Sequence, residues 1–177
     1  MTDFAASYGA SLYSLCKDEG KTDLVHNQLN ELEPLLSAEY KALLDSPMID
    51  LEKRLGLVDE AFSGKVCEYV LNFLKLLTEK KAVYKFGECA RRFKAMYNKD
   101  NNIEIVTAVT AVPMSGELKE KLADKLSGLI NKTVVVHSKT DSTMIGGLVV
   151  RFSDTQIDSS VKSRLESIKN QISGRMV

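Results

Sequence analysis

The stretch Asp141-Ser-Thr-Met-Ile-Gly-Gly-Leu-Val-Val-Arg-Phe-Ser-Asp-Thr-Gln-Ile-Asp-Ser-Ser-Val-Lys-Ser-Arg-Leu165 decides the fold of the C-terminal part of the chain. It begins with a polar turn, after which the pair Gly146-Gly147 opens an apolar strand that continues to Phe152. Small polar residues at Ser153-Asp154 then predict a second turn. Paired glycines before an apolar strand are typical of a tight turn or of a close approach by another backbone.

The end of the same stretch predicts the last helix. Gln156-Ile157 forms a short extended segment, and Asp158 or Ser159 can cap the helix that follows. That helix carries an apolar stripe and closes at Gly174. The stripe consists of Val161, Leu165, Ile168 and Ile172.

Two further strands precede this stretch. The β-branched residues of Ile103–Val112 predict the first strand, and Thr133–His137 predict the second. Between them, Ser115 can cap a helix with one apolar face made of Leu118, Leu122, Leu126, Leu129 and Ile130. Residues 102–177 are therefore predicted to form a β-α-β-β-α domain, a small sheet covered by two helices.

The first 101 residues have a helical period throughout. Six apolar stripes are separated by breakers such as Pro34 and Ser46-Pro47, and Ser37 and Asp50 are suited to cap two of the helices. The first stripe contains Phe4, Tyr8, Leu12 and Leu15, and the fourth contains Leu51, Leu55, Val58 and Phe62. We therefore predict an α+β protein in which a six-helix bundle over residues 1–101 precedes the mixed domain.

Composition excludes several classes of protein. Lys and Arg number 24, as do Asp and Glu, so no overall charge favours nucleic acid or an anionic membrane. No apolar run approaches the roughly 20 residues that span a bilayer. The opening Met1–Ser7 does not resemble a signal peptide, and the three separated cysteines, Cys16, Cys67 and Cys89, indicate reduced thiols packed on helices. These features favour a cytosolic protein.

The sequence contains no recognisable set of catalytic, cofactor-binding or metal-binding residues. The pair Gly146-Gly147 is followed by a strand and not by the helix N-terminus that a phosphate cradle needs. His26 and His137 have no ligand partners at metal-binding spacing and are predicted to be surface residues. Turn and N-cap duties account for the acidic residues Asp141, Asp154 and Asp158.

Binding of a partner helix remains as the function that the helices themselves suggest, because short amphipathic helices can seat another helix in a groove. The candidates on the first helix are Tyr8, Ser11, Leu12 and Leu15, and those on the fifth are Val70, Phe73, Leu74 and Leu77. A core-only role for these residues is equally compatible with the pattern. A rival hypothesis is an RNA-binding adaptor that uses Arg91-Arg92-Phe-Lys94, although that cluster is also typical of a solvated helix face.

Several motifs together resemble the delta subunit of the bacterial F-type ATP synthase, the counterpart of the mitochondrial oligomycin-sensitivity-conferring protein. Tyr8-Gly-Ala-Ser-Leu12 is similar to the family's Tyr-Ala-x-Ala-Leu/Phe opening, with Ser11 where alanine is usual. Asp141-Ser-Thr-Met-Ile-Gly146-Gly147 resembles Asp-Pro-Ser-Leu-Ile-Gly-Gly, with Ser142 in place of proline. Ile157-Asp158-Ser-Ser160-Val161-Lys162 with Arg164-Leu165 resembles Ile/Leu-Asp-x-Ser-Val-Lys-x-Arg-Leu. The likeness covers nearly the whole chain.

The resemblance implies a non-catalytic subunit of the peripheral stalk, present in one copy per complex and without a cofactor. The helical domain would bind N-terminal helices of the alpha subunits, and the second domain would hold the C-terminal end of the b subunits. Such a subunit would lie at the cytoplasmic face of the bacterial membrane without inserting into it, and it would not bind nucleic acid. It would resist rotor torque during ATP synthesis.

Overall fold

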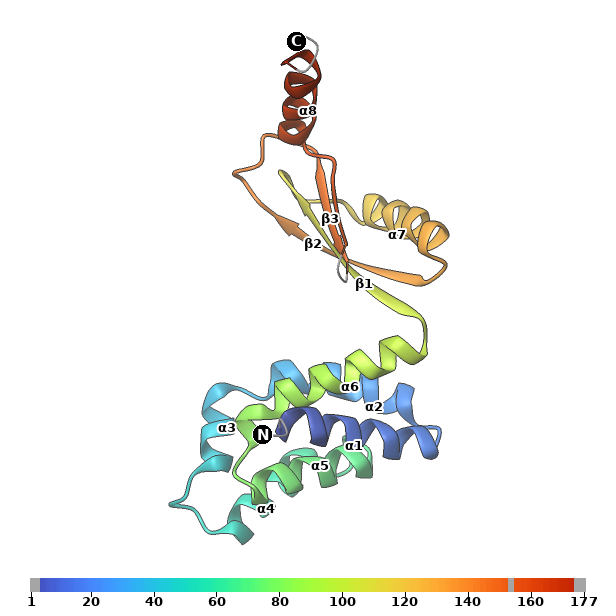
Figure 1. Ribbon diagram of the computed structural model, residues 1–177. Helices are drawn as coiled ribbons and strands as arrows, with labels where there is room; N and C mark the ends of the chain where they lie inside the picture. Colours follow the sequence, from blue (N-terminus) through green and yellow to red (C-terminus); the bar gives the residue numbers. More distant parts are fainter. Residues whose placement is uncertain (1–3, 153–154, 174–177) are drawn as a thin grey trace. The chain divides into compact units, whose positions relative to one another are not determined.

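The computed structural model describes residues 4–152 and 155–173 and divides the chain into two compact units, Met1–Asn98 and Lys99–Val177 (Figure 1). The described part of the first unit is helical. That of the second unit combines a four-stranded sheet with two helices. The predicted α+β class is therefore confirmed.

The helices of the first unit follow one another with short joints. They are α1 (Phe4–Asp18), α2 (Thr22–Leu35), α3 (Ala38–Asp45), α4 (Leu51–Phe62), α5 (Glu68–Glu79), the 3-10 turn η1 (Val83–Lys85) and α6 (Phe86–Asp100). The Ser37 hydroxyl accepts a hydrogen bond from Tyr40 N at 3.1 Å and so caps α3 as predicted. Asp50 stands at the N-cap position of α4, but its carboxylate makes no capping bond there.

The buried face of α1 differs from the predicted stripe. Ala5, Gly9, Leu12, Tyr13 and Cys16 point into the core, whereas Leu15 is 49% exposed. The reason is a close crossing with α6, since a Cβ atom at Gly9 would lie 2.5 Å from the carbonyl oxygen of Cys89. Small residues on this face let the two backbones approach, and the larger stripe is left on the side of α1 that faces α5.

The predicted stripe of α4 is also rotated, because Arg54 occupies the core-facing position. Arg54 is only 4% exposed, while Leu51 is 40% exposed. The guanidinium donates through Nε to Ile49 O and through Nη1 to Leu44 O and Thr78 O, each at 3.0 Å. Leu44 and Thr78 lie in the last turns of α3 and α5, so one cation binds carbonyls at two helix ends.

The second unit contains one strand more than predicted. Its elements are β1 (Ile103–Thr110), α7 (Gly116–Ile130), β2 (Thr133–Thr140), β3 (Leu148–Phe152), β4 (Thr155–Asp158) and α8 (Val161–Ser173), and the strand order is β2-β1-β3-β4. The segment predicted as a short extension is β4, paired antiparallel with β3, so the order is β-α-β-β-β-α. β1 and β2 are parallel and are joined by α7, as parallel strands require a crossover.

Among the described residues, the apolar face of one helix covers the sheet, and not those of two helices as predicted. Helix α7 lies along one face of the sheet (Figure 1). Its residues Leu122, Ala123, Leu126 and Ile130 pack there with Val106, Val134 and Val150. On α8, by contrast, Val161 is 38% exposed, Leu165 57% and Ile168 52%. The apolar stripe of α8 is thus open within the described residues.

The glycine pair holds the start of α8 against the sheet. Gly147 has φ +96°, and a Cβ atom there would lie 2.6 Å from Ser159 O and 2.7 Å from Ser160 Cα. Val161 N donates to Gly146 O at 3.0 Å. The predicted close approach of a second backbone is therefore present at this turn.

The cap of α8 is one or two residues later than predicted. Ser160, not Asp158 or Ser159, accepts from the backbone N–H of Ser163 at 3.2 Å, while Asp158 ends β4 and accepts from Ser160 N at 2.8 Å. The predicted turn at 153–154, which includes Asp154, the side chain of Ile172 and the predicted helix end at Gly174 lie outside the described residues.

Candidate functional site

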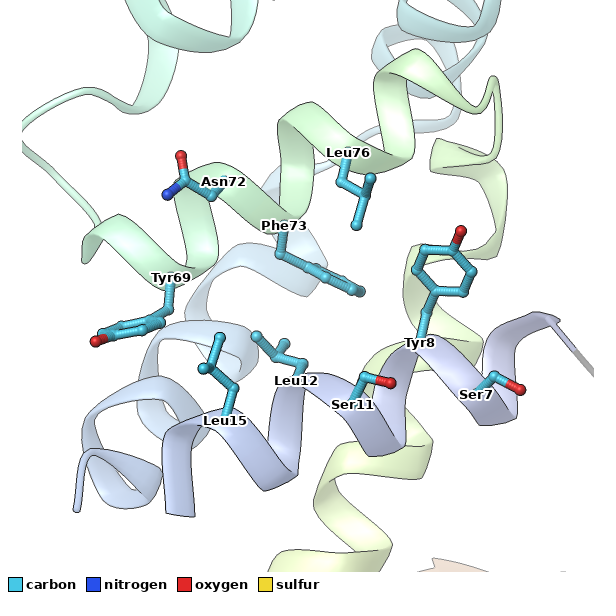
Figure 2. A pocket seen from close by; sticks show the side chains of 9 residues that line it. All are labelled: Ser7, Tyr8, Ser11, Leu12, Leu15, Tyr69, Asn72, Phe73 and Leu76. Atoms are coloured by element: carbon cyan, nitrogen blue, oxygen red, sulfur yellow. The ribbon is translucent and has the colours of Figure 1, made fainter. Parts of the chain in front are cut away.

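A groove of about 390 Å³ lies between α1 and α5 (Figure 2). The two helices run in opposite directions along it, so that Tyr69 lies toward Leu15 and Leu76 toward Tyr8. Its lining residues are Ser7, Tyr8, Ser11, Leu12, Leu15, Tyr69, Asn72, Phe73 and Leu76. Leu12 and Phe73 are nearly buried, whereas Leu15 and Leu76 are 49% and 36% exposed. Partly exposed apolar side chains around a concave apolar surface are typical of a binding site.

The structure brings five of the eight predicted binding residues into this groove: Tyr8, Ser11, Leu12, Leu15 and Phe73. The other three belong to the core instead, since Val70, Leu74 and Leu77 have no exposed surface. On α5 the groove is formed by Tyr69, Asn72 and Leu76, which the apolar pattern of the sequence did not single out. Tyr69, Asn72 and Leu76 lie near Phe73 on the helix surface, and this spacing could have indicated them. The neighbouring stripe of Val70, Leu74 and Leu77 is more apolar and was selected instead.

Lysine ammonium groups lie over the aromatic rings at both ends of the groove. Lys21 Nζ is 4.8 Å from the ring centroid of Tyr69, and its contact with Glu19 Oε2 is a loose 4.0 Å. At the other end, the rings of Phe4 and Tyr8 stack with centroids 4.0 Å apart, and Lys85 Nζ lies 5.5 Å from the Phe4 centroid. The apolar groove is therefore flanked by cations that aromatic faces hold in place.

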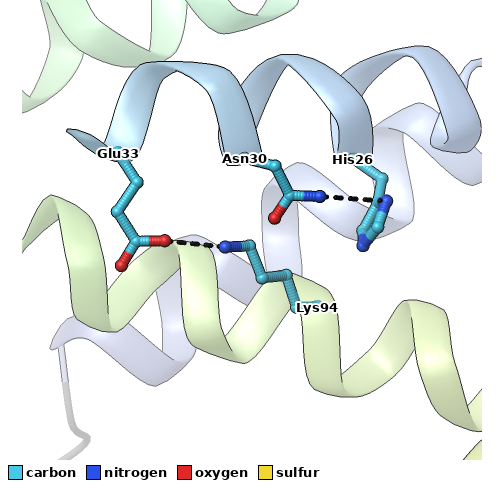
Figure 3. Close-up of polar contacts among 4 residues, drawn as sticks. All are labelled: His26, Asn30, Glu33 and Lys94. Carbon is cyan, nitrogen blue, oxygen red and sulfur yellow. Dashed lines mark hydrogen bonds and ion pairs between the residues drawn. The ribbon is translucent and has the colours of Figure 1, made fainter. Parts of the chain in front are cut away.

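A second polar cluster joins α2 to α6 (Figure 3). The His26 ring, predicted to lie on the surface, is half-buried and stacks on Tyr97 with centroids 4.1 Å apart. Asn30 Nδ2 is 3.5 Å from His26 Nδ1, and Lys94 Nζ donates to Glu33 Oε2 at 2.7 Å. Burial lowers the pKa of His26, and the neighbouring Lys94 charge lowers it further.

We expect the helical unit to lose stability as the pH falls through the ordinary pKa of histidine, about 6.5. Because the pKa of His26 is lower in the folded chain, the unfolded chain binds more protons in that range, and protonation favours unfolding. Urea unfolding between pH 7.5 and 5.5 measures the effect. His26→Gln should remove most of this pH dependence, whereas His137→Gln, at an exposed position on β2, should retain it. Equal slopes in the wild type and His26→Gln would contradict the prediction.

Other candidates from the sequence have structural roles. Hydrogen bonds from the Thr143 hydroxyl and backbone lower the pKa of Asp141, and those from Ser160 lower the pKa of Asp158, as in ordinary turns. His137 is exposed on β2. Among the described residues, no three His, Cys, Asp or Glu side chains lie close enough together to hold a metal ion.

None of the three cysteines forms a disulfide, and two of them, Cys16 and Cys89, are buried. Burial raises the pKa of Cys16 to about 11, so its thiol stays neutral. In the basic cluster on α6, Lys94 pairs with Glu33 and the Cβ and Cγ atoms of Arg92 lie close to Gly9, while Arg91 and Arg92 remain exposed. The cluster therefore presents fewer unpaired cations than the RNA-binding hypothesis assumed.

Comparison with known proteins gives a single family. The model of the family described as ATP synthase delta (OSCP) subunit matches residues 4–172. The chain belongs to this family. "ATP synthase subunit delta" of Clostridioides difficile (strain 630) is 32% identical to it over 172 residues, which cover 96% of this chain and 95% of that protein. "ATP synthase subunit delta" of Chloroherpeton thalassium is 29% identical over 167 residues, 93% of this chain and 91% of that protein.

The delta (OSCP) fold extends over both units. A chain in the cryo-EM structure of the Toxoplasma gondii mitochondrial ATP synthase hexamer has a TM-score of 0.73 at 20% identity, covering 97% of this chain and 98% of that chain. At that identity the likeness concerns the fold alone. In the described part of this delta (OSCP) family member, none of the helices combines the length and the apolar character needed to cross a membrane.

Proposed function

We infer that the chain is the non-catalytic peripheral-stalk subunit of an F-type ATP synthase, which ties the catalytic head to the stalk against rotor torque. The observation that carries this inference is the family match over residues 4–172, which includes both units. A stator subunit needs two separate binding surfaces and a stiff body. It needs no catalytic groups, because it does no chemistry.

The helical unit binds the N-terminal helix of an alpha subunit in the groove between α1 and α5. The groove supports this assignment because its floor is apolar and its walls carry large, partly exposed side chains, which suit the apolar face of an amphipathic helix. Tyr8, Tyr69 and Phe73 supply the rigid aromatic anchors that dominate such interfaces.

The second unit binds the C-terminal end of the b subunits. Two apolar surfaces support this role: the open stripe on α8, and the sheet face opposite α7, where Ile105 is 47% exposed and Val135 42%. A long stalk helix can cover such surfaces. Each complex contains one copy of the subunit, which lies at the cytoplasmic face of the bacterial membrane.

We expect Leu15→Asp to weaken binding of the alpha-subunit helix by tenfold or more. The substitution places a carboxylate on the apolar wall of the groove, and the bound helix would have to desolvate it. The measurement is a fluorescence titration of the full chain with a labelled peptide of about 25 residues from the N-terminus of the alpha subunit of the same ATP synthase.

The matched control is Leu24→Asp. Leu24 has a similar exposure, 46% against 49% for Leu15, but it lies on α2 and does not line the groove. The Leu24→Asp variant should bind the peptide with the same affinity as the wild type. No binding by the wild-type chain at micromolar peptide would contradict the proposed function, and equal losses in the two variants would contradict the assignment to this groove.

A further inference from the structure

The charged residues are arranged differently at the two ends of the groove. Near the Tyr69 and Leu15 end, the sequence places three lysines and three carboxylates, namely Lys17, Lys21, Lys65, Asp18, Glu19 and Glu68. Beyond the Tyr8 and Leu76 end lie three lysines, namely Lys80, Lys81 and Lys85. Their carboxylate neighbours are Asp3 and Glu79 in the sequence, and Asp45, whose carboxylate accepts hydrogen bonds from Val83 N and Tyr84 N at 2.9 Å. The two ends therefore differ in how their lysines are paired.

Two of these lysines stand where the groove would continue. Lys80 follows Leu76 by four residues, and so lies on the same face of α5 one turn further on. Phe4 precedes Tyr8 by four residues on α1, and Lys85 Nζ lies 5.5 Å from its ring centroid. A helix that fills the groove and extends past Tyr8 and Leu76 would therefore meet both ammonium groups.

Neither lysine is neutralised by a carboxylate within the described chain. Lys85 lies over two rings, those of Phe4 and Tyr84, and no described Asp or Glu is within 4 Å of Lys80 or Lys85. Lys21, at the other end, has Glu19 beside it at 4.0 Å. The helix dipoles do not neutralise the two lysines. At this end of the groove the positive N-terminus of α1 lies beside the negative C-terminus of α5, and these two partial charges offset each other.

We propose that Lys80 and Lys85 form a cationic end of the groove that selects an amphipathic helix with a carboxylate in its terminal turn and fixes which way round that helix lies. This inference rests on the proposed function and adds to it the charge of the partner and its direction. The apolar floor supplies most of the affinity. The lysines supply discrimination against the reversed helix and against partners with a basic end.

The test uses the full chain and the same alpha-subunit peptide. We expect the double variant Lys80→Gln/Lys85→Gln to bind about 3- to 10-fold more weakly at low ionic strength, which corresponds to one or two exposed ion pairs. The difference in affinity between the wild type and the double variant should shrink toward zero near 1 M salt, because the Debye screening length there is only about 3 Å. Lys125→Gln, an exposed lysine on α7, controls for the change in net charge and should bind like the wild type. Thermal unfolding of each variant checks that the groove is intact.

A charge exchange identifies the carboxylate. Each Asp and Glu of the peptide is changed in turn to Lys and is titrated against Lys85→Glu. One position, in a terminal turn of the peptide, should recover most of the affinity that Lys85→Glu loses. Wild-type affinity in the double variant, or no recovery at any position, would overturn the cationic end while leaving the groove assignment standing. A wild-type chain that binds no peptide would overturn the proposed function itself.

Discussion

Arg54→Met is expected to destabilise the helical unit by about 3–5 kcal/mol, because hydrogen bonds to a charged group contribute about 1.5–3 kcal/mol each and methionine retains part of the packing. Methionine can fill much of the volume of the arginine side chain but donates no hydrogen bond. The loss of stability therefore arises mainly from the missing hydrogen bonds and only to a small extent from a cavity. With a typical stability of about 5–15 kcal/mol, much of the unit's stability would be lost.

The size of the effect follows from what the guanidinium binds. It donates to Leu44 O, Ile49 O and Thr78 O, each at 3.0 Å, and all three carbonyls lie at or near helix ends. Without the arginine, the carbonyls of Leu44 and Thr78 would lose a buried donor, and water cannot easily replace it at a site only 4% exposed. The cation also opposes the partial negative charge at the C-termini of α3 and α5.

Urea unfolding followed by far-UV circular dichroism measures the change. Lys53→Met is the matched control, because Lys53 precedes Arg54 on α4 but its side chain is 77% exposed, and we expect a change within about 0.5 kcal/mol. Arg54→Lys should fall between the two, since it keeps the charge and loses the planar fork. Equal stabilities for Arg54→Met and Lys53→Met would contradict the structural role.

The sequence predicted where helices begin and end better than which face each helix buries. Ser37 caps α3 as predicted, and α2 continues one residue past Pro34, to Leu35. Such local signals can be interpreted without knowledge of neighbouring elements. The buried faces of α1 and α4 depend on contacts with distant residues. Gly9 faces the core because α6 passes close by, and Arg54 does so because carbonyls of α3 and α5 surround it. The apolar pattern of a single helix contains no information about either of these distant contacts.

The candidate groove was predicted more fully on α1 than on α5 for a related reason. On α1, Ala5 and Gly9 face the core, so that Tyr8 and Leu15 line the groove together with the nearly buried Leu12. On α5, the most apolar positions were selected, and of these only Phe73 reaches the groove, while Val70, Leu74 and Leu77 belong to the core. The groove uses Tyr69, Asn72 and Leu76, whose mixed character is typical of a surface that faces water before it faces a partner.

In the second unit, the sequence predicted two covering helices because α8 has a regular apolar stripe. A stripe indicates that something covers it, but it does not identify the partner. In the structure α7 covers the sheet, and Leu165 and Ile168 of α8 are exposed. The fourth strand was predicted only as an extension because it is four residues long and entirely exposed, so that no alternation of burial marks it.

Gly147→Ala is expected to destabilise the second unit by about 2–5 kcal/mol and to leave the unfolding of the helical unit unchanged. At φ +96° an alanine is strained by about 1–3 kcal/mol. Its Cβ atom would also lie 2.6 Å from Ser159 O and 2.7 Å from Ser160 Cα, both backbone atoms that cannot move aside as a flexible side chain would. Relief of the clash would separate the turn from the start of α8 and break the bond from Val161 N to Gly146 O.

Two glycines of the same unit serve as controls for this change. Gly128 lies in α7, where a Cβ atom would have no neighbour within 4 Å, so Gly128→Ala should stabilise the unit by up to about 1 kcal/mol. Gly146→Ala meets only Val161 Cγ2 at 3.4 Å and should have a small effect. Amide hydrogen exchange distinguishes the units: in Gly147→Ala, protection should fall at Val161 and in β3 and stay unchanged at Phe73. Uniform loss across both units, or wild-type protection at Val161, would contradict this account of the Gly146-Gly147 motif.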